Sequence, residues 1–257
     1  MKRKFKDVKI PVETATLIRD INRIVGKFQK QGLILSIRQL FYQFVAEDVF
    51  PNKEKYYSKL SRVVTLGRRC GKIDHDMFED RLRIERVAHR YDHAVERKVF
   101  DNPHEGFVEP EIWIEKYALA GIVEQVCGPL CVTYVPCEGQ ISDNVAWRFS
   151  KRYFESGRNL QILYLGDHDP SGLQIYKSIC NMIGTYKVDM VPKRIAITKE
   201  QIKKFNPPPN PSKMSDSNFR KYVNQHGPHS YEVDALNPKT LRDIIKAEIL
   251  KLRKEKR

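Results

Sequence analysis

Near the N-terminus, three stretches repeat apolar side chains every three or four positions, the spacing of one helix face. They predict helices over residues 14–31, 37–48 and 55–69. Gly32 ends the first helix, and Ser36 is a suitable N-cap for the second. The apolar positions of the second helix are Ile37, Leu40, Phe41, Phe44 and Val45.

The pattern changes at residues 101–110, a segment with two prolines, a glycine and no periodicity that predicts a linker. Beyond it, short apolar runs alternate with amphipathic stretches. Strands are predicted over residues 112–115, 132–135, 160–165 and 193–197, and helices over 118–126, over 142–153, after Gly172 and at the C-terminal end. The alternation predicts an α/β fold whose parallel sheet is covered on both faces. We therefore expect a helical domain over residues 1–100 and a Rossmann-like sheet domain over 111–257.

Carboxylates follow two of the predicted strands. Glu115 follows the first, and Asp167 and Asp169 follow the third within Gly-Asp-His-Asp-Pro-Ser-Gly. Because ligands bind at the carboxyl ends of parallel strands, we expect the three carboxylates to converge at one edge, together with the loop 138–140. Such oxygens are ligands for Mg²⁺, although aspartates at these positions also serve as turn residues and helix caps.

Tyr42 does not belong to the apolar stripe of the second helix, because it lies well over a right angle from the centre of that stripe. Arg38 is one turn earlier on the same flank. A phenol and a guanidinium therefore project together from a helix whose other face is predicted to be buried. The arginine would hold a phosphate where the phenolic oxygen attacks, whereas an ordinary surface tyrosine is the alternative.

The formal net charge of the chain is +14, which favours a polyanionic partner. Basic residues gather on the predicted third helix and just after it, where they would contact the DNA backbone. They are Lys55, Lys59, Arg62, Arg68, Arg69 and Lys72.

No apolar run approaches the roughly 20 residues of a membrane helix, and no hydrophobic stretch follows the basic start. The five cysteines are odd in number and lack paired zinc-knuckle spacing, so reduced thiols are expected. These features predict a cytoplasmic, nucleoid-associated protein without a membrane partner.

A second acidic pair, Asp74-x-Asp76, precedes no buried strand. It opens a predicted helical segment over residues 77–96, so we interpret it as a helix cap. His89 and His93 are one helical turn apart in that segment but have no evident third ligand.

The acidic motifs together resemble the Toprim domain of the A subunit of type IIB DNA topoisomerases (topoisomerase VI) and its meiotic double-strand-break relatives. The resemblance lies in segments 114–118, 138–143 and 166–172. In addition, Ser36-x-Arg38-x-x-Phe41-Tyr42 resembles the motif of that family's winged-helix domain, where a Tyr-Tyr pair is usual and the second tyrosine is the nucleophile. Phe41 replaces the first tyrosine, and the chain resembles a reduced, "mini-A" form.

The resemblance implies cleavage of double-stranded DNA by Tyr42, assisted by Arg38, with a 5′-phosphotyrosine that permits religation. It implies that Mg²⁺ is held by Glu115, Asp167 and Asp169. Lys116 would either contact the phosphate or face a helix carboxylate, and a homodimer would cut both strands. Strand passage would require a GHKL-type ATPase B subunit as a partner.

Two other functions use the same residues. A Toprim nuclease would hydrolyse nucleic acid with metal-activated water and no covalent intermediate, and Tyr42 would then be an ordinary residue. A non-catalytic DNA-binding protein would keep the acidic residues for structure alone.

Overall fold

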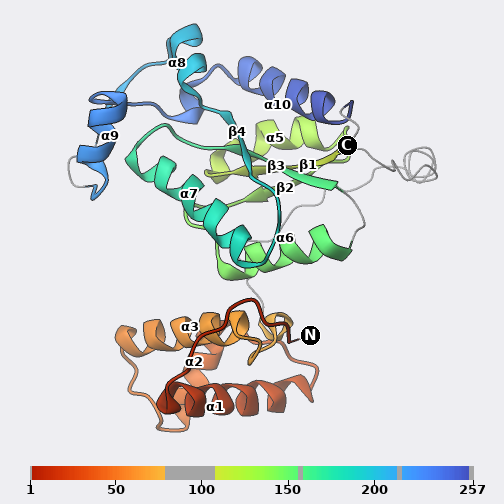
Figure 1. The fold of residues 1–257 in the computed structure, drawn as a ribbon, viewed down its shortest axis with the longest axis vertical. Helices are drawn as coiled ribbons and strands as arrows, with labels where there is room; N and C mark the ends of the chain where they lie inside the picture. The colour runs from red at the N-terminus through yellow and green to blue at the C-terminus, as the bar shows by residue number, and fades with distance from the viewer. Residues whose placement is uncertain (1, 79–107, 156–158, 213–215, 255–257) are drawn as a thin grey trace, which may run out of the picture. The chain divides into compact units, whose positions relative to one another are not determined.

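The structure, a computed structural model, describes residues 2–78, 108–155, 159–212 and 216–254 (Figure 1). The chain forms two compact units, Met1–Leu82 with Thr185–Lys187 and Arg83–Gly184 with Val188–Arg257. The helix predicted over residues 77–96, with its two histidines, lies almost wholly outside the described residues.

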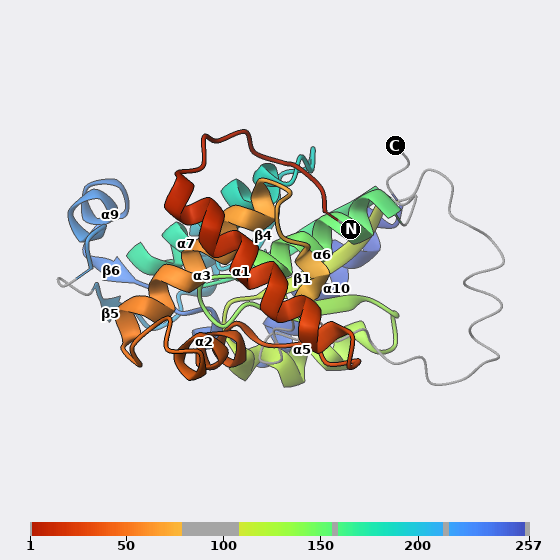
Figure 2. The same cartoon turned by 90° about the horizontal axis from the view of Figure 1, so that it is seen from below.

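The N-terminal unit is built on three helices whose ends lie within two residues of the predicted ones (Figure 2). They are α1 (Val12–Gln29), α2 (Ile37–Ala46) and α3 (Glu54–Arg69), and a 3₁₀ turn follows at His75–Met77. Their apolar stripes meet in one core, to which α2 contributes Leu40, Phe41 and Phe44. Lys4 pairs with Cys70, and Leu35 with Phe78, as isolated β-bridges.

Side chains cap these elements as predicted. The Ser36 hydroxyl accepts a hydrogen bond from the Gln39 amide, and the Gln39 side chain accepts one from the Ser36 amide, which forms a capping box at the start of α2. The Asp74 carboxylate accepts a hydrogen bond from the Asp76 amide at the start of the 3₁₀ turn. The second acidic pair is therefore a capping device.

The second unit contains four parallel strands in the order β2-β1-β3-β4. They are β1 (Val108–Ile114), β2 (Thr133–Pro136), β3 (Asn159–Leu165) and β4 (Lys193–Ala196). The predicted α/β class and parallel sheet are thereby confirmed. β1 and β3 are the central strands and are almost entirely buried, which explains the apolar runs at their C-terminal ends, residues 112–114 and 162–165.

β1 begins inside the predicted linker, so the end of that linker was placed too late. Val108 is buried and lies opposite Asn159, which assigns residues 108–110 to the sheet. Pro110 is tolerated because β2 pairs with β1 only from Glu111 onward, which leaves the proline on an unpaired side of the strand. The rest of the predicted linker lies outside the described residues.

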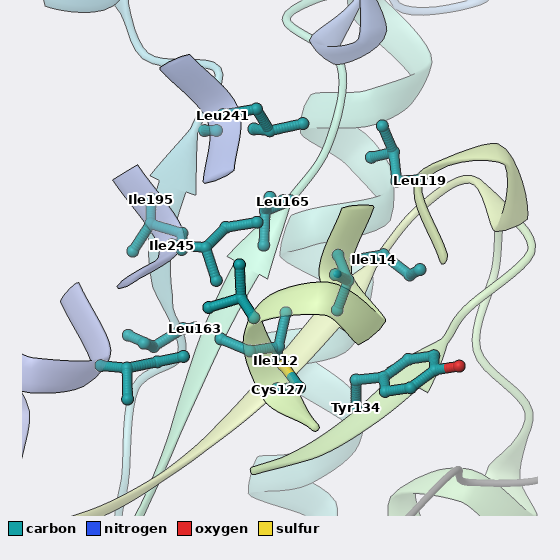
Figure 3. Close-up of a cluster of buried hydrophobic side chains, with 14 of the residues drawn as sticks. Ile112, Ile114, Leu119, Cys127, Tyr134, Leu163, Leu165, Ile195, Leu241 and Ile245 are labelled. Atoms are coloured by element: carbon teal, nitrogen blue, oxygen red, sulfur yellow. The ribbon is translucent and has the colours of Figure 1, made fainter. Parts of the chain in front are cut away.

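Helices cover both faces of the sheet (Figure 1). One face is covered by α5 (Ala120–Cys127), which follows a 3₁₀ turn at Tyr117–Leu119, and by α10 (Pro238–Leu252). Figure 3 shows the core between this face and its helices, with alternate strand residues packed against helical leucines and isoleucines. The labelled residues are Ile112, Ile114, Leu119, Cys127, Tyr134, Leu163, Leu165, Ile195, Leu241 and Ile245.

The opposite face is covered by α6 (Asp143–Glu155) and α7 (Pro170–Thr185). Trp113 of β1 packs edge-on against Phe149 of α6 at a centroid distance of 5.6 Å. Alternate residues of a strand face opposite sides of the sheet, and helices cover both sides. Apolar residues of β1 therefore pack on both faces, Ile112 and Ile114 on one and Trp113 on the other.

A C-terminal extension passes the loop after β3 on its way to α10. Its elements are α8 (Lys199–Phe205), β5 (Asn210–Pro211), α9 (Phe219–His226), β6 (His229–Ser230) and a 3₁₀ turn at Val233–Ala235. Tyr231 forms a β-bridge with His168, which ties this extension to the loop after β3. Among the helices of the described residues, none is both long and apolar enough to cross a membrane.

The direction of the chain across the sheet reverses between β1 and β3. From β1 the chain passes through α5 to β2 on one side, and then through α6 to β3 on the other side. In open α/β sheets, ligands bind at the carboxyl ends of the strands at such a switch point. Glu115 follows β1 and Asp167 follows β3, so the predicted acidic residues flank this point.

Candidate functional site

Glu115 is buried at the carboxyl edge of the sheet. Its amide donates a hydrogen bond to the Leu165 carbonyl at 2.9 Å, which continues the pairing of β1 with β3. Its Oε2 accepts hydrogen bonds from the Tyr164 hydroxyl and the Asp167 amide, each at 3.0 Å. The Gly139 amide donates to the Glu115 carbonyl at 3.2 Å. Glu115, the loop after β3 and the loop 138–140 therefore meet at one edge, as expected.

Gly166 permits this close approach of the two strand ends. A Cβ atom on this residue would lie 2.5 Å from both Glu115 Oε2 and the Tyr164 hydroxyl oxygen. Any side chain at position 166 would therefore displace the carboxylate. The glycine that ends β3 is a requirement of the site and not only a break in the strand.

Asp167 is buried, and both of its oxygens have partners. Oδ1 accepts a hydrogen bond from the Val233 amide at 2.9 Å. Oδ2 lies 2.9 Å from the Lys116 ammonium nitrogen, which is also 3.0 Å from Glu232 Oε2 and 3.3 Å from Asp234 Oδ1. Lys116, which follows Glu115 in the chain, thus pairs with the negative charge of Asp167 and links Asp167 to the C-terminal extension.

Of the two roles expected of Lys116, the structure shows contact with carboxylates, because its ammonium group lies among three of them. Its assignment to DNA contact is corrected accordingly. Its side chain is 29% exposed, and burial disfavours its charged form. Hydrogen bonds to Asp167 and Glu232 outweigh that effect, so the pKa of Lys116 is raised and the ammonium stays charged.

Asp169 has the arrangement of a helix cap. It directly precedes Pro170, the first residue of α7, and its Oδ1 accepts a hydrogen bond from the Gly172 amide. The capping alternative for this aspartate is therefore present in the structure. Its second oxygen, Oδ2, is the one that would face a ligand.

Burial dominates the electrostatics of the carboxylates. It raises the pKa of Glu115 from 4.5 to about 7, and the negative charge of Asp167 adds to the shift. Burial also raises the pKa of Asp167, against the opposing effect of the Val233 amide and Lys116. Burial, followed by the charge of Glu115, raises the pKa of Tyr164, so its hydroxyl stays protonated and donates to that carboxylate.

The donor chemistry of the edge suits Mg²⁺, but the side chains are not arranged around a metal. Three carboxylates supply hard oxygen ligands, and a divalent cation would relieve the mutual repulsion of Glu115 and Asp167. Even so, among the described residues no group of three or more His, Cys, Asp or Glu side chains has the geometry to hold a metal ion. In the structure, Asp167 Oδ2 has the Lys116 ammonium group beside it at 2.9 Å.

Arg194 of β4 belongs to this edge and was missed by the sequence-based prediction. Its Nη2 donates hydrogen bonds to the Gly166 carbonyl at 2.6 Å and to the Asp167 carbonyl, and its Nε donates to the Ile197 carbonyl. Nη1 is buried and has no hydrogen-bond partner among the described residues. The guanidinium fixes the backbone that presents Asp167. Arg194 is the second residue of the strand predicted over residues 193–197, and no sequence motif around it indicates this role.

His168, between the two aspartates, fastens the same loop to α9. Its Nδ1 lies 2.9 Å from the Tyr222 hydroxyl, which is also 2.7 Å from the His168 carbonyl. Burial, with a smaller effect of the positive charge of Arg194, lowers the pKa of His168 to about 4. The imidazole is therefore neutral at neutral pH and supports the loop.

Tyr42 and Arg38 project together from α2, as predicted. The side chain of Tyr42 is 45% exposed, and Arg38 is also exposed. A hydrogen bond to Tyr42 raises the pKa of the Arg38 guanidinium, and the Tyr57 ring lies 6.0 Å from that group. Phe41, in contrast, is in the core. The phenol and the guanidinium thus form a pair on the surface of the N-terminal unit.

The basic residues of α3 divide into exposed and buried ones. Lys55, Lys59, Arg62 and Lys72 are exposed and Arg69 is half-buried, so these side chains remain candidates for contact with DNA. Arg68 was assigned wrongly, because it is only 2% exposed. Its guanidinium donates to the His75 carbonyl at 3.1 Å and lies over the Phe78 ring, so it stabilises the core of this unit.

Neither the comparison with protein-family models nor the search of curated proteins returns a match for this chain. The function is therefore inferred from the residues of the acidic edge and of the Arg38–Tyr42 pair.

Proposed function

We propose that this chain is a Toprim-type protein that cleaves double-stranded DNA by Mg²⁺-dependent transesterification through Tyr42, in the manner of a topoisomerase VI A subunit. The main support is the meeting of Glu115 and Asp167 at the switch point of the sheet, with Asp169 two residues further along. The N-terminal unit would bind DNA as a winged-helix-like domain. The exposed basic residues of α3 are suited to its phosphates.

In the proposed reaction, Tyr42 Oη attacks a backbone phosphorus, and the bond from that phosphorus to the 3′ oxygen breaks. The phenolic proton is lost to solvent and the 3′ oxygen takes up a proton, which leaves a 5′-phosphotyrosine and a free 3′-hydroxyl. Arg38, which is hydrogen-bonded to Tyr42, would hold the attacked phosphate and stabilise the phenolate. Glu115, Asp167 and Asp169 would hold Mg²⁺, which would supply positive charge for the attacked phosphate and the leaving oxygen.

The resemblance to the topoisomerase VI family extends the proposal to a homodimer. In that family, the tyrosine of one protomer acts with the acidic residues of the other, so two copies would cut both strands. Resealing would be the reverse reaction, because the phosphotyrosine conserves the energy of the phosphodiester. Strand passage would require a GHKL-type ATPase B subunit.

A hydrolytic nuclease is the second candidate, and one observation favours it. Burial and the charge of Asp167 raise the pKa of Glu115 to about 7, the range in which a carboxylate is an effective general base for water. Such an enzyme would not need Tyr42. The three carboxylates serve both mechanisms, so only the tyrosine distinguishes them.

Replacement of Tyr42 by phenylalanine separates the two candidates. The full chain would be incubated with supercoiled plasmid and Mg²⁺, and products would be separated on denaturing gels with and without protease treatment. We expect Tyr42→Phe to lose both cleavage and the protein–DNA adduct, by at least about a thousandfold, because no other oxygen occupies the nucleophile position. Tyr56→Phe, at a tyrosine whose ring lies 5.4 Å from that of Phe50 in the same unit, is the matched control and should cleave normally. Unchanged cleavage without an adduct in Tyr42→Phe would establish the hydrolytic mechanism instead.

The third candidate, a non-catalytic DNA-binding protein, is tested at Asp167. Asp167→Asn keeps an oxygen for the Val233 amide but removes the negative charge. We expect cleavage to be lost while binding of DNA, measured by fluorescence anisotropy, is retained. If the wild-type protein binds DNA and cuts none under any divalent cation, the enzymatic proposal is wrong.

A further inference from the structure

We propose that Lys116 is an internal cation that Mg²⁺ displaces from Asp167, and that Glu232 and Asp234 are the residues that receive the displaced ammonium group. This inference rests on the proposed magnesium site. It assigns a positioning role to two acidic residues of the C-terminal extension, which lie outside every motif that suggested the function.

The ammonium group of Lys116 occupies the position beside Asp167 that a bound Mg²⁺ ion would need. Its nitrogen is 2.9 Å from Asp167 Oδ2, the ion-pair distance, and the other oxygen of Asp167 is held by the Val233 amide. Asp167 therefore has no oxygen without a partner. A cation that binds through Asp167 has to share or replace the contact with Lys116.

Glu232 and Asp234 offer Lys116 an alternative position that costs little. They lie 3.0 and 3.3 Å from its nitrogen, and their side chains are 47% and 39% exposed, whereas that of Asp167 is 7% exposed. Movement of the ammonium by a small distance toward these two would keep it charged and paired. The exposed pair would then be neutralised by the lysine, and the buried carboxylate by the metal.

The backbone of the extension keeps this receiving pair in register with the site. The Val233 amide, between the two acidic residues, donates to Asp167, and Tyr231 exchanges backbone hydrogen bonds with His168. Glu232 and Asp234 flank an anchored residue, so both side chains are held beside Lys116. The extension thereby links the position of the lysine to the loop that carries the aspartates.

Affinity for Mg²⁺ tests the proposal without any measurement of activity. The full chain would be titrated with MgCl₂ at pH 8 in a calorimeter, with Asp167→Asn as the variant that lacks the site. We expect Lys116→Met to bind Mg²⁺ about tenfold more tightly, because a competing and repelling charge is gone. We expect Glu232→Gln/Asp234→Asn to bind about tenfold more weakly, because Lys116 then has only Asp167 as a partner.

A combined variant separates exchange from simple loss of negative charge. In the Lys116→Met background, Glu232→Gln/Asp234→Asn should change the affinity by less than about twofold, because there is no ammonium left to receive. Lys193→Met is the matched control, because Lys193 forms a 2.6 Å ion pair with Glu248 at the other end of β4 and should leave the affinity unchanged.

The outcomes distinguish this inference from the proposed function. If Asp167→Asn abolishes binding but Lys116→Met leaves the affinity unchanged, the metal site stands and the exchange is wrong. The exchange is also wrong if the Glu232/Asp234 substitutions weaken binding equally with and without Lys116. If Lys116→Met does not fold, Lys116→Gln, which also removes the charge but keeps a polar side chain beside Asp167, replaces it in both arms. Absence of Mg²⁺ binding in the wild-type protein would overturn the proposed metal site and the exchange together.

Discussion

The Arg38–Tyr42 pair and the acidic edge would supply the two halves of one reaction, yet they lie in opposite physical environments. Tyr42 is 45% exposed on a helix surface, whereas Glu115 and Asp167 are 8% and 5% exposed. Glu115 and Asp167 have fixed partners, and burial raises the pKa of both. Substitution of the exposed pair should therefore change chemistry alone, while substitution at the edge should change charge, loop position and stability together.

The largest expected effect is on the pH dependence of stability, at Glu115. Its pKa is about 7 in the folded protein against 4.5 in the unfolded chain, so its contribution to stability is fully present below pH 4.5 and is lost as the pH rises through 7. Between pH 4.5 and 8, without divalent cations, wild type should lose about 3 kcal/mol of unfolding free energy relative to Glu115→Gln. Urea titrations followed by fluorescence measure this, because both tryptophans lie in the sheet unit. Parallel pH profiles of the two proteins would contradict the assignment.

Arg194→Met should destabilise the sheet unit by about 2–3 kcal/mol, because buried carbonyls of the loop lose their donor. Arg194→Lys should fall between this variant and wild type, since an ammonium group has no planar fork. The control is Arg242→Met, whose exposed partner is Asp243 and whose effect should stay within about 0.5 kcal/mol. Equal effects at both arginines would show that Arg194 does not hold the loop.

Two glycines of the sheet unit should respond to alanine with opposite signs. Gly166→Ala should cost about 2 kcal/mol, because its Cβ would collide with Glu115 and Tyr164. Gly121 lies within α5 with open space around its Cβ position, so Gly121→Ala should stabilise the unit by about 0.5–1 kcal/mol. Both values come from the same fluorescence-monitored titration. If Gly166→Ala left the unfolding free energy unchanged, the close contact of Gly166 with Glu115 and Tyr164 would be contradicted.

The smallest effect is expected at the exposed pair. Arg38→Gln and Tyr42→Phe should each change the unfolding free energy by less than about 0.5 kcal/mol. Circular dichroism is the suitable measurement, because no tryptophan lies in the N-terminal unit. Leu40→Ala, at a fully buried position of the same helix, should lower the unfolding free energy by about 2–4 kcal/mol. This control shows that the measurement detects destabilisation of the N-terminal unit. A large loss in Tyr42→Phe would remove the contrast between the two regions.

Much of this fold was predictable because its signals are local. Apolar spacing identified α1, α2 and α3 within two residues, and the alternation of short strands with helices indicated the parallel sheet. The rule for the carboxyl ends of parallel strands was sufficient to bring Glu115 and Asp167 together. The predicted end of the linker was wrong at Pro110. A proline is allowed in β1 there because β2 pairs with β1 only from Glu111 onward, and the extent of strand pairing cannot be read from the local sequence.

The errors at the site have a common cause. The run of basic residues at the end of α3 placed Arg68 among the DNA contacts, but the fold of the residues after α3 brings the His75 carbonyl and the Phe78 ring to it. The family resemblance left Lys116 between a phosphate and a carboxylate, and a segment 116 residues later supplies the carboxylate partner. Neither contact follows from the helix or strand period, so neither shows in local sequence patterns.

By itself, the sequence determined which residues end the strands and which residues share the surface of a helix, because strand and helix geometry are periodic. It therefore determined the acidic edge and the Arg38–Tyr42 pair. Only the tertiary structure decided how the charges at the edge are balanced. Burial raises the carboxylate pKa values, Arg194 and Val233 hold the Asp167 loop from other elements, and Lys116 is shared with Glu232 and Asp234. Charge balance in a buried site depends on distances between segments that are remote in the chain, and those distances exist only after folding.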